Sequence, residues 1–164
     1  MDYHHPMVEL SKGAAAPDFS LTNADGSCIR MKDFAGSSVI LYFYPAALTP
    51  GCTVEAIDFS AAKDDFSSAG YVILGVSPDD TEQLRTFVTQ NNLRITLLAD
   101  PDLEVIKAYG AWGDRTLWGK VFTGVIRSTF VIDVDDSGQG SIRDAQYGVR
   151  ATGHVKRLRA ELGV

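Results

Sequence analysis

The sequence predicts an α/β protein in which helices cover the faces of a mixed β-sheet. Continuous apolar runs, as in strands that are buried on both faces, recur along the chain, and segments with helical periodicity separate them. Near the C-terminus, two strand-like segments follow each other across a turn before a last helical segment. Alternating strands and helices form parallel pairs and successive strands form antiparallel pairs, so both kinds of pairing are expected in one sheet.

The composition is that of an ordinary folded protein. The 164 residues suffice for one core, and 45% of them are apolar, which argues against disorder. A formal net charge of −6 disfavours a nucleic-acid partner. Neither a membrane span nor a secretory signal is visible, so we expect no membrane association and a cytoplasmic location. We predict an N-terminal arm, residues 1–12, and a single domain, residues 13–164.

The first elements follow from local patterns. Turn residues at Asn23–Ser27 lie between two short extended runs and predict an N-terminal β-hairpin. Val39–Tyr44 is continuously apolar or aromatic and predicts a buried strand, which Pro45 ends. Residues 59–69 place their apolar side chains on one helical face, and Gly70 suits the end of that helix.

The next elements continue the alternation. Tyr71–Val76 predicts a second buried strand. Asp79 stands three residues before Glu82, which predicts a capping box at the start of a second helix. Ile95–Leu98 predicts a third strand, and Leu103–Tyr109 predicts a short helix.

The last third of the chain predicts a hairpin and a helix. Ser128–Val134 is a strand-like run, and the turn residues Asp135–Gly138 lead to another near Ser141–Ala145. Apolar residues at helical spacing between Val155 and Leu162 predict the final helix.

Cys52 has the sequence context of a reactive thiol. It follows the first long strand and a Pro50-Gly51 turn, where the next helix begins. The amides and the dipole of a helix N-terminus favour a thiolate and can bind a polarised oxygen. Thr49 offers a hydroxyl that can donate and accept, and Pro45 stiffens the loop. The alternative is that Cys52 is a small buried apolar side chain.

The surroundings of Cys52 resemble the active-site motif of peroxiredoxins, and among them the bacterioferritin comigratory protein (BCP/PrxQ) subfamily. The motif reads Tyr42-Phe43-Tyr44-Pro45…Thr49-Pro50-Gly51-Cys52-Thr53-x-Glu55-Ala56. Further segments in the order of that subfamily are Ala16-Pro17-Asp18-Phe19, Asp33-Phe34-x-Gly36, Gly75-Val76-Ser77-x-Asp79, Leu97-Leu98-x-Asp100, Tyr109-Gly110-x-Trp112-Gly113 and Arg127-Ser128-Thr129-Phe130. The resemblance covers residues 13–162 and implies a thioredoxin-like fold with an N-terminal hairpin extension.

The resemblance also implies a thiol peroxidase that reduces hydrogen peroxide and organic hydroperoxides in antioxidant defence. Cys52 would be the peroxidatic cysteine, whose thiolate becomes a sulfenic acid. Thr49 would hydrogen-bond the peroxide, the backbone N–H of Cys52 would complete the oxygen site, and Pro45 would shield the sulfenate from water. Gly51 would support the turn before Cys52.

Two charged residues complete the implied site. Arg127 would stabilise the thiolate and orient the peroxide, and Glu55 would hold Arg127 in place. Each assignment has an ordinary structural alternative. Thr49 could cap a helix, Arg127 could be a surface residue, and Glu55 could interact with the helix dipole.

A resolving cysteine is missing from the positions where the subfamily has one. Position 57 is Ile57, and the helical segment Asp80–Gln90 has no cysteine. We therefore favour a 1-Cys form that an external thiol recycles, such as thioredoxin, glutaredoxin or a small thiol. Cys28, in the predicted hairpin, is a structural residue in this interpretation; alternatively, it resolves the sulfenic acid within the chain or across a dimer.

We expect no cofactor and no metal, because His4 and His5 in the arm have no third ligand nearby. Two other functions use the same thiol. A peroxide sensor or redox relay would be oxidised without turnover. A thioredoxin-like disulfide oxidoreductase would need a Cys-x-x-Cys pair, which the residues after Cys52 do not supply. The resemblance suggests a monomer or a weak homodimer.

Overall fold

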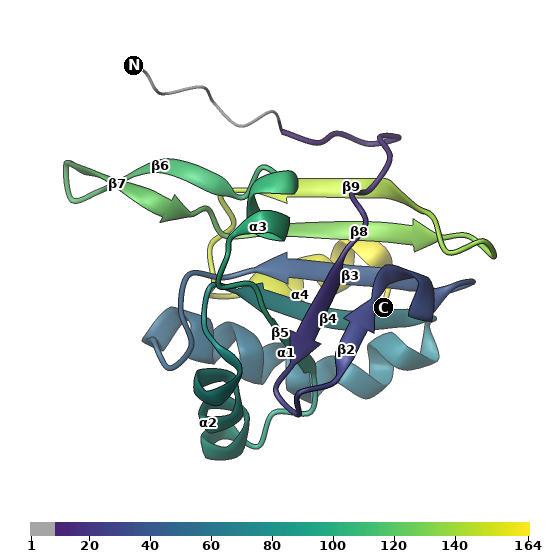
Figure 1. Ribbon diagram of the computed structural model, residues 1–164, viewed down its shortest axis with the longest axis horizontal. Helices are drawn as coiled ribbons and strands as arrows, with labels where there is room; N and C mark the ends of the chain where they lie inside the picture. The colour runs from purple at the N-terminus through teal and green to yellow at the C-terminus, as the bar shows by residue number, and fades with distance from the viewer. Residues whose placement is uncertain (1–8) are drawn as a thin grey trace.

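The computed structural model describes residues 9–164 and contains a seven-stranded mixed sheet (Figure 1). The strands are β1 Ser20–Asn23, β2 Cys28–Arg30, β3 Ser38–Phe43, β4 Tyr71–Ser77, β5 Thr96–Ala99, β8 Ser128–Val134 and β9 Gly140–Tyr147. Their order across the sheet is β2-β1-β5-β4-β3-β8-β9. Strands β3, β4 and β5 are parallel, and the other pairs are antiparallel. The predicted α/β class with a mixed sheet is thereby confirmed.

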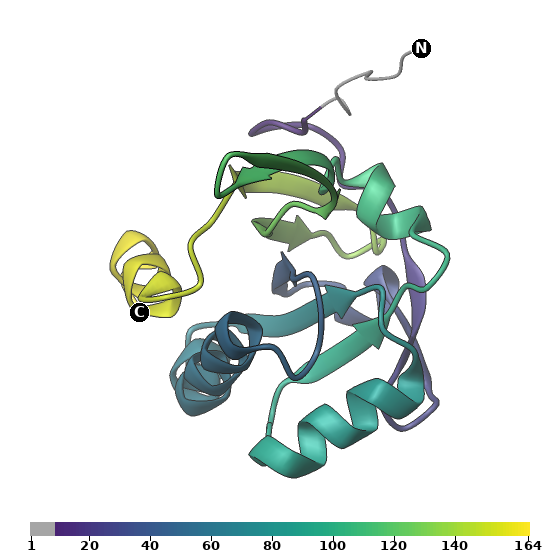
Figure 2. The same ribbon diagram turned by 90° about the vertical axis from the view of Figure 1, so that its left-hand side faces the viewer.

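Helices lie on both faces of this sheet (Figure 2). They are α1 Pro50–Ser68, α2 Thr81–Asn91, α3 Glu104–Ala108 and α4 His154–Leu162, with a 3₁₀ turn η1 at Met31–Phe34. One apolar cluster joins the sheet to α1, α2 and α4, and a second joins the opposite face to α3 and η1. Helices α1 and α2 are the crossovers of two consecutive βαβ units, as the alternating pattern predicted.

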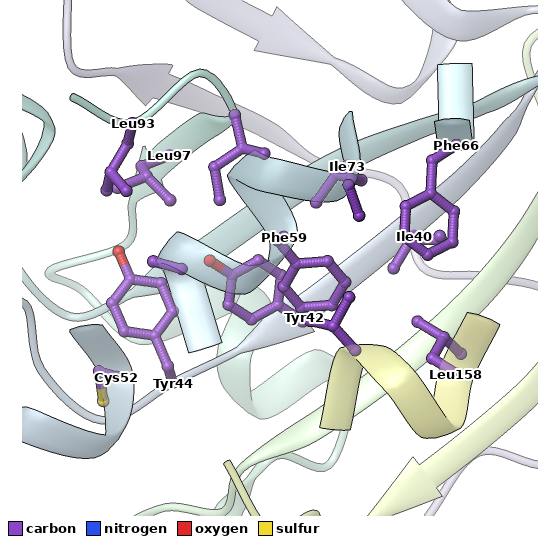
Figure 3. Close-up of a cluster of buried hydrophobic side chains, with 14 of the residues drawn as sticks. Ile40, Tyr42, Tyr44, Cys52, Phe59, Phe66, Ile73, Leu93, Leu97 and Leu158 are labelled. Atoms are coloured by element: carbon purple, nitrogen blue, oxygen red, sulfur yellow. The ribbon is translucent and has the colours of Figure 1, made fainter. Parts of the chain in front are cut away.

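The strand β3 is the centre of both clusters. Five of its six residues are buried, which agrees with the unbroken apolar run in the sequence. The ring of Tyr42 stacks on Phe59 of α1 with centroids 4.6 Å apart, and both belong to the cluster in Figure 3. The helix that carries Phe59 ends at Ser68, and Gly70 then takes a φ of 89°, as predicted for this position.

The predicted N-terminal hairpin consists of β1 and β2, which pair antiparallel. The division into an arm, residues 1–12, and a domain, residues 13–164, stays a prediction, and residues 1–8 lie outside the described part of the chain.

One hairpin, which lies between α3 and β8 in the chain, was not predicted. Strands β6, Trp112–Leu117, and β7, Lys120–Val125, pair with each other outside the main sheet and extend away from it (Figure 1). Trp118 in the turn between them is 93% exposed. These strands alternate poorly between apolar and polar residues and contain glycines, so they carry no period-2 pattern that would predict a strand.

The capping box of α2 differs from the prediction by one residue. Asp80, not Asp79, is the N-cap, and its side chain accepts a hydrogen bond from the backbone N–H of Gln83 at 2.8 Å. The Gln83 side chain completes the box by accepting from the Asp80 N–H at 2.9 Å. Asp79 is thereby free to contact another segment.

Replacing Gly75 by alanine is predicted to destabilise the fold. A Cβ at Gly75 would lie 2.8 Å from Cζ of Tyr42 and 2.8 Å from Cδ2 of Leu97, both in the packed core. Such crowding costs about 1–3 kcal/mol of unfolding free energy, measurable by urea denaturation. Gly124→Ala in β7 is the matched control, since a Cβ there meets nothing within 4 Å. Equal stabilities of the two variants would contradict the prediction.

Candidate active site

The loop between β3 and α1 brings Cys52 to the carboxyl end of the parallel strands. The loop runs from Tyr44 to Thr49, and Cys52 is the third residue of α1. Cys52 is 2% exposed and belongs to the apolar cluster that includes Tyr44 (Figure 3). In the first turn of a helix, backbone N–H groups have no helical carbonyl to bond to. The N–H of Cys52 is therefore suited to bind an oxygen atom close to its own sulfur.

Arg127 reaches Cys52 from the segment that precedes β8. It directly precedes β8, whose first residue, Ser128, pairs with Phe43 at the end of β3. Its Nη2 donates to Sγ of Cys52 at 3.3 Å, and its Nη1 donates to Oε1 of Glu55 at 2.6 Å. One guanidinium thus contacts both residues of α1, which excludes the alternative that Arg127 is an ordinary surface residue.

Glu55 is fully buried one turn after Cys52 on α1. Burial raises the pKa of its carboxyl to about 7, although Arg127 acts to lower it. Burial alone lowers the pKa of Arg127, but the attraction of Glu55 and Cys52 outweighs this and the pKa is raised. The arginine therefore keeps its positive charge beside the sulfur, and the carboxyl completes the ion pair as it ionises near neutral pH.

Thr49 occupies the N-cap position of α1, but its side chain makes no cap hydrogen bond. Its hydroxyl instead donates to the carbonyl oxygen of Ala46 at 2.7 Å. Because that proton is engaged, the lone pairs of the hydroxyl remain for accepting a hydrogen bond from a ligand. Leu48, directly before it, has a φ of 65°, a left-handed conformation that is uncommon for leucine and typical of functional loops.

Two further predicted residues line the same region. Pro45 is half-buried and directly follows buried Tyr44. At Gly51, an added Cβ would lie 3.6 Å from Cβ of Ala151 and 3.6 Å from Nη2 of Arg127. These are ordinary contact distances, so the structure shows no steric requirement for glycine at position 51.

Cys28 lies far from this group of residues. It is exposed on the edge strand β2, and its Sγ lies 3.0 Å from Oγ of Ser20. Hydrogen bonding to Ser20 lowers the pKa of its thiol. Four strand-to-strand steps separate β2 from β3, which at the usual spacing is about 19 Å. A disulfide needs Cα atoms within roughly 7 Å, so this fold does not place Cys28 in bonding range of Cys52.

Asp79 is a residue of this site that the sequence analysis assigned elsewhere. Its Oδ2 accepts from the backbone N–H of Ala47, in the loop before Cys52, at 2.7 Å. The Ser77 hydroxyl donates to the same oxygen at 2.7 Å. The available signal was the position of Asp79 just after the end of a buried strand, where ligands tend to bind in α/β sheets.

Residues 9–164 contain no group of three or more His, Cys, Asp or Glu side chains that could hold a metal ion. His4 and His5 lie outside the described residues. Within the same part of the chain, no helix has the length and hydrophobicity that are needed to cross a membrane.

Comparison with known proteins places this arrangement in a family. Residues 12–139 match the AhpC/TSA family. The chain belongs to this family. A putative peroxiredoxin of Mycobacterium tuberculosis is 50% identical over 157 residues, which cover 96% of this chain and 98% of the relative. Peroxiredoxin Bcp of Escherichia coli is 42% identical over 129 residues, 79% of this chain and 83% of the relative.

Solved structures agree with this assignment. The bacterioferritin comigratory protein of Xanthomonas campestris, whose structures address its alkyl peroxide reduction activity, superimposes with a TM-score of 0.78 at 31% identity. The superposition covers 88% of this chain and 90% of that one. The protein is a peroxiredoxin of the Bcp/PrxQ type and hence a thiol peroxidase with a thioredoxin-like fold.

The buried carboxyl of this peroxiredoxin makes its stability depend on pH. The pKa of Glu55, about 7 in the folded protein, is raised above its ordinary value of 4.5. Its contribution to stability is therefore fully present below pH 4.5 and is lost as the pH rises through 7. Between pH 5 and pH 8, the unfolding free energy of the wild type should fall by about 2–3 kcal/mol relative to Glu55→Gln.

Urea denaturation of both proteins across this pH range measures that difference. The other titrating groups are common to the two chains, so their contributions cancel. A difference that does not change with pH would show that Glu55 is ionised throughout the range.

Proposed function

We propose that Cys52 is the peroxidatic cysteine of this peroxiredoxin and reduces hydrogen peroxide and organic hydroperoxides. The observation that carries the proposal is the guanidinium of Arg127, which donates to the Cys52 sulfur while buried Glu55 holds its other nitrogen. A permanent cation at hydrogen-bond distance favours thiolate over thiol, and the thiolate is the nucleophile that attacks an O–O bond.

The first step transfers one oxygen atom to the sulfur. The Cys52 thiolate attacks the nearer oxygen of ROOH, an S–O bond forms, and the O–O bond breaks. The departing RO⁻ takes a proton and leaves as ROH, or as water when the substrate is hydrogen peroxide. Cys52 is thereby oxidised to a sulfenic acid, and the peroxide is reduced by two electrons. Negative charge moves from the sulfur to the leaving oxygen, and donors fixed around both atoms stabilise this change.

Three groups around the sulfur suit that step. Thr49, whose hydroxyl proton is engaged by the carbonyl of Ala46, accepts a hydrogen bond from the peroxide and so orients it. The N–H of Cys52 and the Nη2 of Arg127 donate to the oxygen atoms. Pro45 has no N–H that could bind water, and it shields the sulfenate of Cys52 from water. The supporting role of Gly51, which lies in the first turn of α1, stays a prediction.

The surroundings of the loop favour organic substrates as well. Leu48, Val54 and Ile57 are exposed apolar side chains near Cys52 in the sequence, between 43% and 45% exposed. An alkyl group could contact them while its hydroperoxide enters the polar site. The related protein of Xanthomonas campestris, with its alkyl peroxide reduction activity, supports this extension.

We propose that an external thiol completes the cycle, which makes this a 1-Cys form. The outside thiol attacks the sulfenic sulfur, releases water and leaves a mixed disulfide. A second thiol then attacks the outside sulfur of this disulfide, so that Cys52 leaves as the free thiol and the two outside thiols are oxidised to a disulfide. Thioredoxin, glutaredoxin or a small thiol could supply both. Ile57 replaces the helical resolving cysteine, and the separation of Cys28 from the site disfavours it as a resolving residue within the chain. A cytoplasmic location and a monomeric or weakly dimeric state stay predictions.

The experiment that tests this function treats the reduced protein with one equivalent of hydrogen peroxide and a sulfenic-acid trap. Intact mass and peptide mapping then locate the product. We expect one adduct, on Cys52, and none in Cys52→Ser. An oxidised Cys28–Cys52 peptide would overturn the 1-Cys cycle, and a Cys52 that does not react would overturn the peroxidase itself. Turnover with an added thiol separates an enzyme from a sensor that is oxidised once.

Removing the guanidinium is predicted to slow peroxide reduction severely. Arg127→Ala should lower kcat/KM for hydrogen peroxide by about 10²–10³-fold, because a donor to the reacting atoms is lost. Arg94→Ala is the matched control, since Arg94 pairs with Asp64 on the surface. Initial rates in a coupled peroxidase assay measure both variants, and normal activity of Arg127→Ala would contradict its assigned role.

A further inference from the structure

A carboxylate outside the reacting groups holds the loop that carries Thr49. Asp79 lies two residues after the end of β4, and its Oδ2 accepts from the N–H of Ala47 at 2.7 Å. The hydroxyl of Ser77 donates to the same oxygen at 2.7 Å and so orients the carboxylate. Ser77 is fully buried, and its carbonyl accepts from the N–H of Asp100 at 2.9 Å. The contact therefore connects the loop to a fixed part of the sheet.

The loop leaves the sheet just before this contact. The N–H of Tyr44 donates to the carbonyl of Val76 at 3.1 Å, which continues the pairing of β3 with β4 by one residue. Beyond it, Leu48 has its left-handed φ of 65°. A residue other than glycine keeps such a conformation when its surroundings enforce it. Asp79 supplies a constraint of this kind one residue before Leu48.

The hydrogen bond of Asp79 also bears on the position of the Thr49 hydroxyl. That hydroxyl donates to the carbonyl of Ala46, and the Ala46 carbonyl belongs to the same peptide unit as the Ala47 N–H. One planar peptide group therefore accepts from Thr49 and donates to Asp79. A rotation of this peptide would therefore break the hydrogen bond that fixes the Thr49 hydroxyl.

We propose that Asp79 is a positioning residue for peroxide reduction, which fixes the Ala46–Ala47 peptide and thereby keeps the loop from Pro45 to Thr49 closed over Cys52. The inference rests on the proposed function, because its effect is exerted on the reaction of Cys52 with peroxide. A closed loop presents Thr49 to a small peroxide. It also shields the sulfur of Cys52, which is 2% exposed, from larger reagents. Loss of Asp79 should therefore change two reactions of Cys52 in opposite directions.

The test compares Asp79→Ala, Asp79→Asn and the neighbouring control Asp80→Asn with the wild type. Two rate constants are measured on the full-length reduced proteins by rapid quenching, mass spectrometry and peptide mapping of Cys52. The first is for oxidation by hydrogen peroxide. The second is for alkylation by iodoacetamide without peroxide.

We expect Asp79→Ala to oxidise about 10²-fold more slowly, as for a misplaced group in an active site. Its alkylation should be roughly tenfold faster, because local opening exposes the sulfur. Asp79→Asn should restore both rates to within about threefold, since its amide oxygen can accept both hydrogen bonds. Asp80→Asn should match the wild type, because asparagine also serves as an N-cap.

Two results would overturn the inference. One is an Asp79→Ala protein with wild-type rates, and the other is a parallel fall of both rates, which would indicate a less reactive thiol and not an open loop. If circular dichroism shows that Asp79→Ala does not fold, Ser77→Ala decides: slower oxidation with faster alkylation supports the inference, and unchanged rates overturn it. A wild-type Cys52 that peroxide does not oxidise would instead contradict the proposed function.

Discussion

The guanidinium of Arg127 is the group on which the whole site depends. It donates to the sulfur of Cys52 and to the buried carboxyl of Glu55, and so joins the segment before β8 to the first turns of α1. A planar group with several donors can make both contacts at once, which the single ammonium of a lysine would do less well. The antiparallel pairing of β8 with β3 determines where this arginine lies, so the architecture of the sheet brings the guanidinium to the sulfur.

This arrangement places a carboxyl where burial opposes its charge. Glu55 has one oxygen on Arg127 and a second, Oε2, without a hydrogen-bond partner among the described residues. An unpaired buried oxygen lowers the free energy of unfolding, so this site reduces the stability of the protein. The large apolar clusters on both faces of the sheet offset such a cost.

Much of this fold could be predicted because its central strands are buried on both faces. The strands β3 and β4 are almost continuously apolar and β8 has an apolar centre, and the apolar residues between 59 and 69 recur at helical spacing. The hairpin of β6 and β7 escaped prediction because its exposed strands bury little, so no alternation selects their residues. Backbone hydrogen bonds between β6 and β7, and not a pattern of side chains, define this hairpin.

The site was predictable to a similar extent. Motif resemblance pointed to Arg127 and Glu55, which the structure joins to Cys52, since each lies at a fixed position in a recurring string. Asp79 was not recognised, because Asp79 with Glu82 and Asp80 with Gln83 fit a capping box equally well in the sequence. Asp79 accepts instead from the N–H of Ala47, 32 residues away, and Asp80 is the N-cap. A contact over that separation in the chain cannot be predicted from a local sequence pattern.

The hairpin that the sequence did not reveal holds both tryptophans of the chain, Trp112 in β6 and Trp118 in the turn. Trp112 packs against the second apolar cluster and lies under Nζ of Lys107, whereas Trp118 is surrounded by solvent. Tryptophan emission from this protein therefore originates in one peripheral element. A fluorescence change upon oxidation of Cys52 would report on the hairpin and its contacts, and the central sheet could remain intact while the signal changes.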